Sequence, residues 1–327
     1  MNELLRWGIL STANHADSAY VPAIQASRNG CVAAVASRSL EKASNFAQKH
    51  HIPKVHGSYE ALLTDPEIDL IYNPLPNGMH AEWSIRAAEA GKPVLCEKPL
   101  CANGREAEQM AEAVRKTGVP IAEAYMYRLH PLNCQARDLL RDGRIGDVRN
   151  VHAQFFAGGD DPDNIRFSQA LAGGSMRDLG GYCTSLMRFL LGEEPEEVKA
   201  VSQEHPNGGI DYRLSGVLRF PEGRTASFDC GFGVPFTCSY TVIGTEGRLA
   251  VPTGAMVASK TKEQPIHLWT ADGRFEEIMT PVANHYQLMA EHFADVVKGT
   301  ATLLYPIEDA VANMRVMDRV LEAAGYP

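Results

Sequence analysis

Four short polar stretches in the first hundred residues carry side chains suited to holding phosphate groups and moving protons. They are Ser11-Thr12-Ala13-Asn14-His15-Ala16, Ser37-Arg38, Pro74-Leu75-Pro76-Asn77-Gly78-Met79-His80 and Glu97-Lys98-Pro99. Hydroxyl groups and the planar guanidinium of arginine are good donors to phosphate oxygens. A lysine placed within about 3 Å of an alcohol oxygen can take its proton. The four stretches could therefore hold a phosphorylated ligand beside a general base.

Each stretch also has a simpler interpretation. A turn of Ser, Thr, Ala and Asn can cap a helix, and Arg38 and Lys98 can be solvated surface charges. Pro74 and Pro76 can merely steer a loop. The functional interpretation rests on their coincidence, because every stretch follows a short apolar run. If those runs are parallel strands, their carboxyl ends meet at the edge of the sheet where such folds bind ligands.

The elements of the first 124 residues alternate between apolar runs and helical patterns. Ser39 and Ser58 are suitable N-caps, and Gly91 and Gly118 stand where C′ glycines belong. Strands alternating with helices predict a doubly wound parallel sheet of the Rossmann type. We expect strands at residues 4–10, 31–36, around 55, 69–73, 93–96 and 119–122, and helices at 40–50, 59–63, 80–90 and 103–117.

The second part of the chain has a different sequence pattern, in which strand-like apolar runs follow one another with turn residues between them. Hairpin connections are expected at residues 221–223 and 245–247. This pattern predicts an α+β domain with a large, mostly antiparallel sheet, and hence two domains, 1–124 and 125–327. The expected strands are 197–203, 212–220, 225–232, 238–244, 248–251, 266–269 and 274–278, and the expected helices 132–141, 178–191, 286–298 and 307–324.

The turn after the first strand lacks the glycines of the dinucleotide fingerprint G-x-G-x-x-G/A. Ser11, Ala13 and Ala16 stand in their places, although glycine alone enters positive-φ conformations freely and lets a pyrophosphate approach the backbone. The hydroxyls of Ser11 and Thr12 could return hydrogen bonds to the phosphate. The fingerprint is therefore weakened, and a dinucleotide site remains compatible with the turn.

The second strand ends in Ser37-Arg38, with Lys42 one helical turn later. An NAD site usually has Asp or Glu at this place to bind the ribose 2′-hydroxyl, whereas an arginine accommodates the 2′-phosphate of NADP. The residues predict NADP(H) in preference to NAD(H), with NAD(H) as the alternative.

Bulk properties exclude several classes of partner. The 327 residues carry a net charge of −9, which argues against nucleic acid and anionic membranes as ligands. We find no signal peptide and no run long enough to cross a bilayer. Seven cysteines without C-x-x-C spacing fit reduced thiols in the cytoplasm. His50, His51 and His56 lack metal-ligand spacing, so no metal is expected.

Three motifs of the chain are distinctive: A-G-K-P-V-L-C-E-K-P (90–99), N-P-L-P-N-G-M-H (73–80) and G-G-S-M-R-D-L-G-G-Y (173–182). They resemble motifs of the glucose-fructose oxidoreductase and inositol dehydrogenase (Gfo/Idh/MocA) family. E-A-Y-M-Y-R-L-H-P (123–131) is similar to the domain junction of one branch, which holds NADP-linked xylose dehydrogenases, dihydrodiol dehydrogenases and glucose-fructose oxidoreductase. W-G-I-L-S-T-A resembles a first-strand variant of that branch, and His15 departs from the hydrophobic residue expected there.

The resemblance implies a Rossmann domain followed by an open-faced antiparallel sheet whose free face commonly mediates dimerisation, so a homodimer or higher homo-oligomer is expected. It also implies that Lys98 is catalytic. Asp178 and Tyr182 stand four apart on a predicted helix and share one face. Family members carry Asp at the first of these positions and His or Tyr at the second. The simpler roles are an N-cap for Asp178 and a core aromatic for Tyr182.

Two sets of ligand contacts follow. Met126, Tyr127 and Arg166 are weaker substrate-binding candidates beside Asp178 and Tyr182. The expected cofactor-binding residues are Ser11, Thr12, Ala13, Asn14, His15, Ser37, Arg38, Lys42, Pro74, Leu75, Pro76, Asn77, His80, Glu97 and Lys98.

The resulting hypothesis is an NADP-dependent oxidoreductase acting on a hydroxyl or carbonyl carbon of a sugar or cyclic polyol, with an aldose 1-dehydrogenase favoured. Lys98 and Tyr182 would transfer the proton. The alternatives are a trans-dihydrodiol dehydrogenase or another sugar reductase and, from a different class, a non-catalytic dinucleotide-binding sensor. Because a sensor has no need of Lys98, Asp178 and Tyr182 together, the sequence favours the enzyme.

Overall fold

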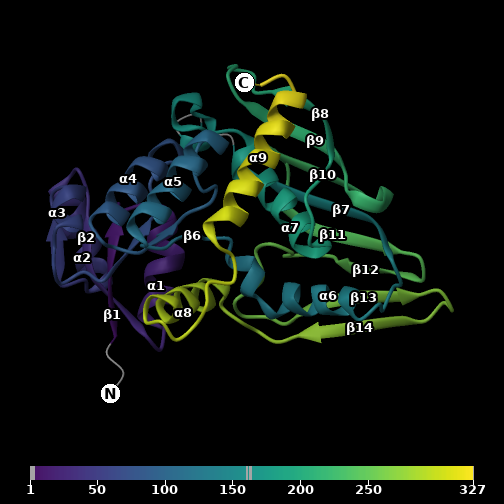
Figure 1. Ribbon diagram of the computed structural model, residues 1–327, viewed down its shortest axis with the longest axis horizontal. Coiled ribbons are helices and arrows are strands. Elements are labelled where there is room, and N and C mark those ends of the chain that lie inside the picture. The colour runs from purple at the N-terminus through teal and green to yellow at the C-terminus, as the bar shows by residue number, and fades with distance from the viewer. Residues whose placement is uncertain (1–3, 160, 162–163, 327) are drawn as a thin grey trace. The chain divides into compact units, whose positions relative to one another are not determined.

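The computed structural model describes residues 4–159, 161 and 164–326, which form two compact units (Figure 1). The first unit contains the chain up to Met126 together with Tyr286–Val311, and the second contains Tyr127–His285 and the chain from Ala312 onward. Residues 286–311, which the sequence analysis places in a second domain 125–327, thus lie in the first compact unit.

The returning segment joins the first unit through contacts distant in sequence. Helix α8 (His285–Val297) supplies Asp295, which pairs with Arg28 and accepts a hydrogen bond from Asn29 at 2.8 Å. Phe293 of the same helix packs against Trp7, with ring centroids 6.1 Å apart. Contacts between residues more than 260 positions apart produce no local sequence pattern. An interpretation based on local patterns therefore predicts a single boundary between the two domains.

The first unit is built on a parallel sheet of six strands within the described residues, in the order β3-β2-β1-β4-β5-β6. This confirms the predicted doubly wound fold. The order reverses between β1 and β4, which marks the crevice where such sheets bind ligands. The strands are β1 (Leu5–Leu10), β2 (Gly30–Ala36), β3 (Lys54–His56), β4 (Leu70–Asn73), β5 (Val94–Cys96) and β6 (Ile121–Glu123).

Capping residues fix the helices of this unit. Ser39 accepts a hydrogen bond from the backbone of Lys42, and Ser58 accepts one from Ala61, as predicted. Gly118 ends α5 with a φ of 71°. Helix α4 begins directly after Pro76, three residues before its predicted start. The elements are a π-helical turn (Ala16–Tyr20), α1 (Val21–Gln25), α2 (Leu40–His50), α3 (Tyr59–Leu63), α4 (Asn77–Glu89) and α5 (Gly104–Thr117).

The second unit holds an eight-stranded sheet in the order β14-β13-β12-β11-β7-β10-β9-β8, counted over the described residues. Neighbouring strands there run antiparallel apart from the parallel pair of β7 and β10. The strands are β7 (Val148–Ala157), β8 (Glu197–Glu204), β9 (Asp211–Arg219), β10 (Thr225–Phe232), β11 (Thr237–Gly244), β12 (Gly247–Val251), β13 (Gln264–Thr270) and β14 (Phe275–Thr280).

In the part of the chain that the structure describes, one face of this sheet is covered and the other is not. Alternate residues such as Val151, Phe228 and Leu249 are fully buried, and helices α6 (Pro131–Arg141) and α7 (Gly181–Leu191) pack on the sheet (Figure 1). A π-helical turn, Met176–Gly180, precedes α7. The remaining elements are α9 (Ile307–Ala323), through which the division between the units passes, and short 3₁₀ turns at Met126–Leu129, Ile165–Phe167, Gln169–Leu171 and Pro221–Gly223.

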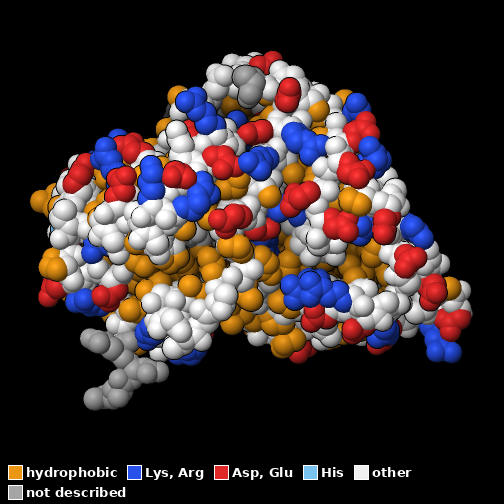
Figure 2. Space-filling view, in the orientation of Figure 1, with side chains coloured by type: hydrophobic (Ala, Val, Ile, Leu, Met, Phe, Trp, Pro, Cys, Tyr) orange, Lys and Arg blue, Asp and Glu red, His pale blue; other side chains and the backbone are white. Residues whose placement is uncertain are grey.

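Two surface properties bear on partners. Acidic and basic side chains are interspersed over the face seen in Figure 2, without a broad area of one sign. Among the described residues, no helix combines the length and the apolar character needed to span a membrane.

Candidate active site

The predicted strand ends lie along one edge of the parallel sheet because backbone hydrogen bonds tie them together. The Ser11 amide donates to Ala36 at the end of β2 (2.9 Å), and the Glu97 amide donates to Asn73 at the end of β4 (3.0 Å). The Ser37 amide donates to His56 at the end of β3 (3.2 Å). The four polar stretches are thus neighbours in the fold, at the edge and switch point that the topology defines.

The first turn adopts a glycine-like backbone without a glycine. Ser11 has a φ of 106°, in the region that non-glycine residues rarely occupy. Ser11, Thr12 and Ala13 are half-buried and Asn14 is exposed, so short side chains line this turn. Ser11, which stands at the position of the first fingerprint glycine, therefore has a glycine-like backbone conformation, with hydroxyl groups beside it.

The end of β2 offers a cation and no carboxylate over residues 36–40. Arg38 and Lys42 are exposed, whereas Ser37 is buried and its hydroxyl accepts a hydrogen bond from the Ser39 amide at 3.2 Å. Burial raises the pKa of Tyr59, while the neighbouring Arg38 guanidinium acts in the opposite direction through a hydrogen bond. Arg38 and Lys42 are therefore exposed cations near this strand end.

His15 faces the lysine-bearing turn. Its Nε2 lies 3.5 Å from Glu97 Oε1. Its ring meets the rings of Tyr20 and Tyr286 edge-on, with centroids 5.7 and 5.3 Å apart. The polar residue that replaces the expected hydrophobic one thus links the first turn to Glu97.

Glu97 holds the backbone of Lys98. It is 6 % exposed, and Tyr72 donates to its Oε1 at 2.8 Å while the Lys98 amide contacts its Oε2 at 3.2 Å. Burial, followed by the charge of Glu97, raises the pKa of Tyr72 well above its usual range. Tyr72 therefore remains a protonated donor, and the carboxylate anchors the turn that carries Lys98, itself half-buried.

His80 is a bridge between two loops. Its buried ring places Nδ1 2.8 Å from the carbonyl of Pro99 and Nε2 2.6 Å from the carbonyl of Leu75. Burial lowers the pKa of the ring. Since both ring nitrogens lie beside backbone carbonyls, His80 connects the Leu75 loop to the Lys98-Pro99 turn. Its direct contact with a cofactor stays a prediction.

Two buried residues that the sequence interpretation missed hold the same loops. Glu123, the last residue of β6, accepts the amide of Leu100 at 2.7 Å. Asn73, the last residue of β4, accepts the amide of Leu75 at 3.3 Å. Each is the last residue of a parallel strand, and this position could have identified both of them from the sequence. Of the predicted loop residues between them, Pro74 and Leu75 are buried, whereas Pro76 and Asn77 are half-buried and accessible.

In the second unit, two predicted substrate-binding residues form an ion pair. Arg166 Nε donates to Asp178 Oδ2 at 2.6 Å. Asp178 lies inside the π-helical turn that begins at Met176, with Ser175 at the N-cap position, so the simpler N-cap role for Asp178 is wrong. The Tyr182 ring is buried against Phe155, with centroids 5.3 Å apart.

Met126 and Tyr127 are core residues of their respective units. Both are buried, and the Tyr127 hydroxyl lies 2.7 Å from Ser185 Oγ. Arg128 donates to the same Ser185 oxygen at 2.8 Å. Tyr127 therefore packs in the core of its unit, and its contact with substrate stays a prediction.

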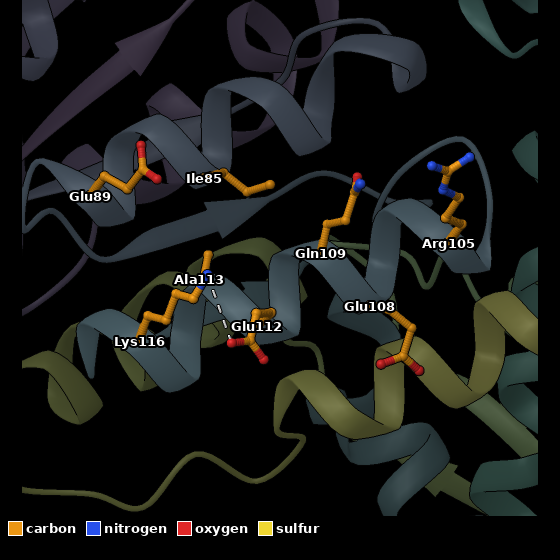
Figure 3. A pocket seen from close by; sticks show the side chains of 8 residues that line it. All are labelled: Ile85, Glu89, Arg105, Glu108, Gln109, Glu112, Ala113 and Lys116. Atoms are coloured by element: carbon orange, nitrogen blue, oxygen red, sulfur yellow. Dashed lines mark ion pairs between the residues drawn. The ribbon is translucent and has the colours of Figure 1, made fainter.

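A groove between α4 and α5 lies on the helices, away from the strand ends (Figure 3). Its lining contains three glutamates, one arginine and one lysine, and Lys116 pairs with Glu112 at 3.9 Å. We assign it no part in the site. It is lined by Ile85, Glu89, Arg105, Glu108, Gln109, Glu112, Ala113 and Lys116.

Comparison with known families agrees with this architecture. Residues 5–125 match the oxidoreductase family with an NAD-binding Rossmann fold, and residues 134–250 match the GFO/IDH/MocA C-terminal domain. The chain belongs to the GFO/IDH/MocA family. The resemblance drawn from the motifs is confirmed, and the protein is a GFO/IDH/MocA oxidoreductase.

Individual relatives can be aligned with most of this chain. It is 38 % identical to D-xylose 1-dehydrogenase (NADP(+)) 2 of Haloferax volcanii, over 98 % of this chain and 97 % of that one. It is 36 % identical to mouse trans-1,2-dihydrobenzene-1,2-diol dehydrogenase, over 86 % of each chain. The 3-ketoreductase KijD10 of Actinomadura kijaniata, solved with NADP and TDP-benzene, has a TM-score of 0.93 and 29 % identity over 98 % of each chain.

Proposed function

We propose that this protein is an NADP-dependent aldose 1-dehydrogenase. The observation that carries the proposal is the Lys98 turn, which Glu97, His80 and Glu123 fasten at the ligand-binding edge of the sheet. A general base needs such a fixed position to meet a substrate hydroxyl. The relative from Haloferax volcanii, named for xylose oxidation with NADP, supports the choice of an aldose.

The residues at the sheet edge fit a nicotinamide dinucleotide, which supplies the hydride acceptor when bound. The turn of Ser11 and Thr12 would hold its pyrophosphate. The Arg38 guanidinium, assisted by Lys42, would bind the 2′-phosphate that distinguishes NADP from NAD. The solved relative that contains NADP supports the same preference.

The proton chemistry would belong to three side chains. Lys98 would accept the proton of the sugar hydroxyl as the carbon is oxidised, and Tyr182 would relay it while holding the substrate oxygen. Asp178, fixed by Arg166, would accept hydrogen bonds from neighbouring hydroxyls of the sugar. We further infer a cytoplasmic protein, in keeping with seven free cysteines.

A trans-dihydrodiol dehydrogenase is the second candidate. The mouse relative is named for that reaction, and a cyclic diol presents a secondary hydroxyl as an aldopyranose does. A non-catalytic sensor would bind the dinucleotide at the same edge without using Lys98.

The Lys98→Met variant separates these functions. We expect NADPH to form from NADP with at least one aldose or cyclic diol, and the variant to lose about 10²-fold or more in kcat, because it removes the general base. Its affinity for NADPH, measured by fluorescence titration, should stay within about twofold of wild type. Lys116→Met, on the exposed face of α5, is the matched control. Wild-type protein that binds NADPH but oxidises no substrate of a broad polyol panel would indicate the sensor.

We also propose that the protein is a homo-oligomer joined through the uncovered face of the second sheet. Strand register places Val201 beside Ser215, Val217 beside Ser227, and Ile243 beside Arg248 on that face. Val201, Val217, Ile243, Phe275 and Met279 are exposed there by 47–71 %. A face that mixes exposed apolar and polar side chains suits a second copy of the chain.

A further inference from the structure

A buried carboxylate with no part in the proposed chemistry lies beside the loop of residues 166–178, which carries the proposed substrate contacts Arg166 and Asp178. Asp211 is the first residue of β9 and is 1 % exposed. Its Oδ2 accepts hydrogen bonds from Ser175 Oγ at 2.7 Å and from the Met176 amide at 2.5 Å. A methyl group on Gly174, whose φ is 111°, would overlap Asp211 Oδ1. The carboxylate therefore determines the path of the chain from Gly174 to Met176.

That path in turn fixes Arg166 and Asp178. The Gly174 amide donates to the carbonyl of Arg166 at 2.8 Å, and the Asp178 amide donates to the carbonyl of Gly174 at 3.1 Å. A methyl group on Gly173 would overlap the Arg166 carbonyl. The Arg166–Asp178 ion pair closes the arrangement. Hydrogen bonds and close backbone contacts thus connect the buried carboxylate to both side chains of the pair.

We propose that Asp211 is a positioning residue for substrate binding, which holds the Arg166–Asp178 loop in the shape that presents both side chains to the sugar. This inference rests on the proposed function, because it takes Arg166 and Asp178 as substrate contacts. Asp211 itself is buried and acts through the Gly174–Met176 turn.

The charge on Asp211 matters for this role. Hydrogen bonds to an ionised acceptor are about twice as strong as those between neutral groups. Burial raises the pKa of Asp211 to about 6, against the hydrogen bonds of Ser175 and Met176 and the charge of Arg177. The other titratable groups near it are Cys230, whose thiol lies 3.8 Å from Ser175 Oγ, Glu204, opposite Asp211 in the β8–β9 register, and Tyr326, whose pKa is raised in part by Asp211. Below pH 6 the carboxylate gains a proton, and its hold on the turn weakens.

The Asp211→Asn variant tests the role, because the amide keeps the shape and one acceptor oxygen but has no charge. We expect the KM for the sugar to rise at least fivefold at pH 8, with the Kd of NADPH unchanged. In the wild type the KM should increase as the pH falls from 8 to 5, and in the variant this increase should disappear. Asp211→Ala should raise the KM further. Asp138→Asn, on the exposed side of α6, should match wild type. A variant with wild-type KM and pH profile would overturn the proposal.

A second measurement does not depend on turnover. The amides of Gly174 and Met176 are donors in this arrangement, so their hydrogen exchange should accelerate at least tenfold in the Asp211→Asn variant, with no change in the parallel sheet. If wild type binds NADPH but oxidises no sugar, the proposed function fails. The hydrogen-exchange rates of the Gly174 and Met176 amides then test by themselves whether Asp211 holds the loop. Unchanged exchange at both amides would overturn the positioning role, and faster exchange confined to residues 166–178 would support it.

Discussion

We propose that Arg38 is the residue on which the preference for NADP over NAD depends. It is exposed at the end of β2, and residues 36–40 contain no carboxylate that would bind a ribose 2′-hydroxyl. A guanidinium that hydrogen-bonds a phosphate contributes about 1.5–3 kcal/mol, which corresponds to roughly 10- to 100-fold in affinity. We predict a loss of this size in NADPH affinity for Arg38→Ala and less than about a twofold change for NADH.

Fluorescence titration of both reduced cofactors measures this difference directly. Arg105→Ala, at the start of α5, removes a positive charge elsewhere on the same unit and serves as the control. Equal losses for NADPH and NADH would contradict a role in binding the 2′-phosphate, and would instead indicate that Arg38 supports the loop through Tyr59.

The positions of Arg38 and Lys98 could be predicted from the sequence because strand ends follow from local apolar runs. The partners of these residues could not. Glu97 accepts a hydrogen bond from the hydroxyl of Tyr72, which lies on another strand. Both ring nitrogens of His80 lie within hydrogen-bond distance of backbone carbonyls. Such contacts depend on how the loops fold over the sheet edge, which residue types and spacing do not encode. The same holds for Tyr127, whose motif suggested a ligand contact and whose hydroxyl lies against Ser185.

At the scale of elements, the turn that leads into α7 depends on a glycine with two separate constraints. Gly174 has a φ of 111°, and an added methyl group would overlap the buried Asp211 carboxylate. Gly192, which ends α7 with a φ of 73°, has no heavy atom within 4 Å of such a methyl group. A positive φ alone costs a non-glycine residue about 1 kcal/mol. We predict that Gly174→Ala lowers the free energy of unfolding by about 2–4 kcal/mol and Gly192→Ala by about 1 kcal/mol.

Urea denaturation of the two variants, read by circular dichroism, gives the comparison. The pair is matched, because both substitutions add one methyl group at a positive-φ glycine of the second unit. Equal destabilisation would show that the Asp211 side chain moves aside freely, and would weaken the case for its hold on the turn.

Elements with strong local signals were predicted within a few residues, and those without them were missed. Helices α2 and α3 have the predicted bounds because a serine cap and a helical apolar pattern agree at each. Strand β7, at the centre of the second sheet, was missed because polar residues such as Asn150, His152 and Gln154 alternate along it. Those residues belong to the uncovered face, so the pattern of period two was present but lacked the continuous apolar run by which the other strands were found.

For the whole molecule, the feature that bears on assembly is the uncovered face of the second sheet, where Val201, Val217, Ile243, Phe275 and Met279 are exposed. Its apolar residues lie on β8, β9, β11 and β14, and all point to the side opposite α6 and α7. Burying exposed apolar surface contributes about 25 cal/mol per Å², so a second copy placed there would gain stability. The covered face contributes to the fold of one chain, and the open face is where we propose that a second copy binds.

Val217→Asp tests that assembly. Val217 is 52 % exposed on β9, with Lys199 and Ser227 as its cross-strand neighbours on the same face. A carboxylate there costs little in the monomer, where water and Lys199 lie beside it, but moving it out of water into an interface costs several kcal/mol of desolvation. We predict that wild type sediments as a dimer or larger oligomer, and that Val217→Asp weakens association by about 10²-fold or more, measured by sedimentation velocity over a range of concentrations. Leu304→Asp, at an exposed apolar residue outside the sheet, should sediment like wild type. An unchanged oligomer for Val217→Asp would place the interface elsewhere, since a new charge on this face cannot be neutral to an assembly that buries it.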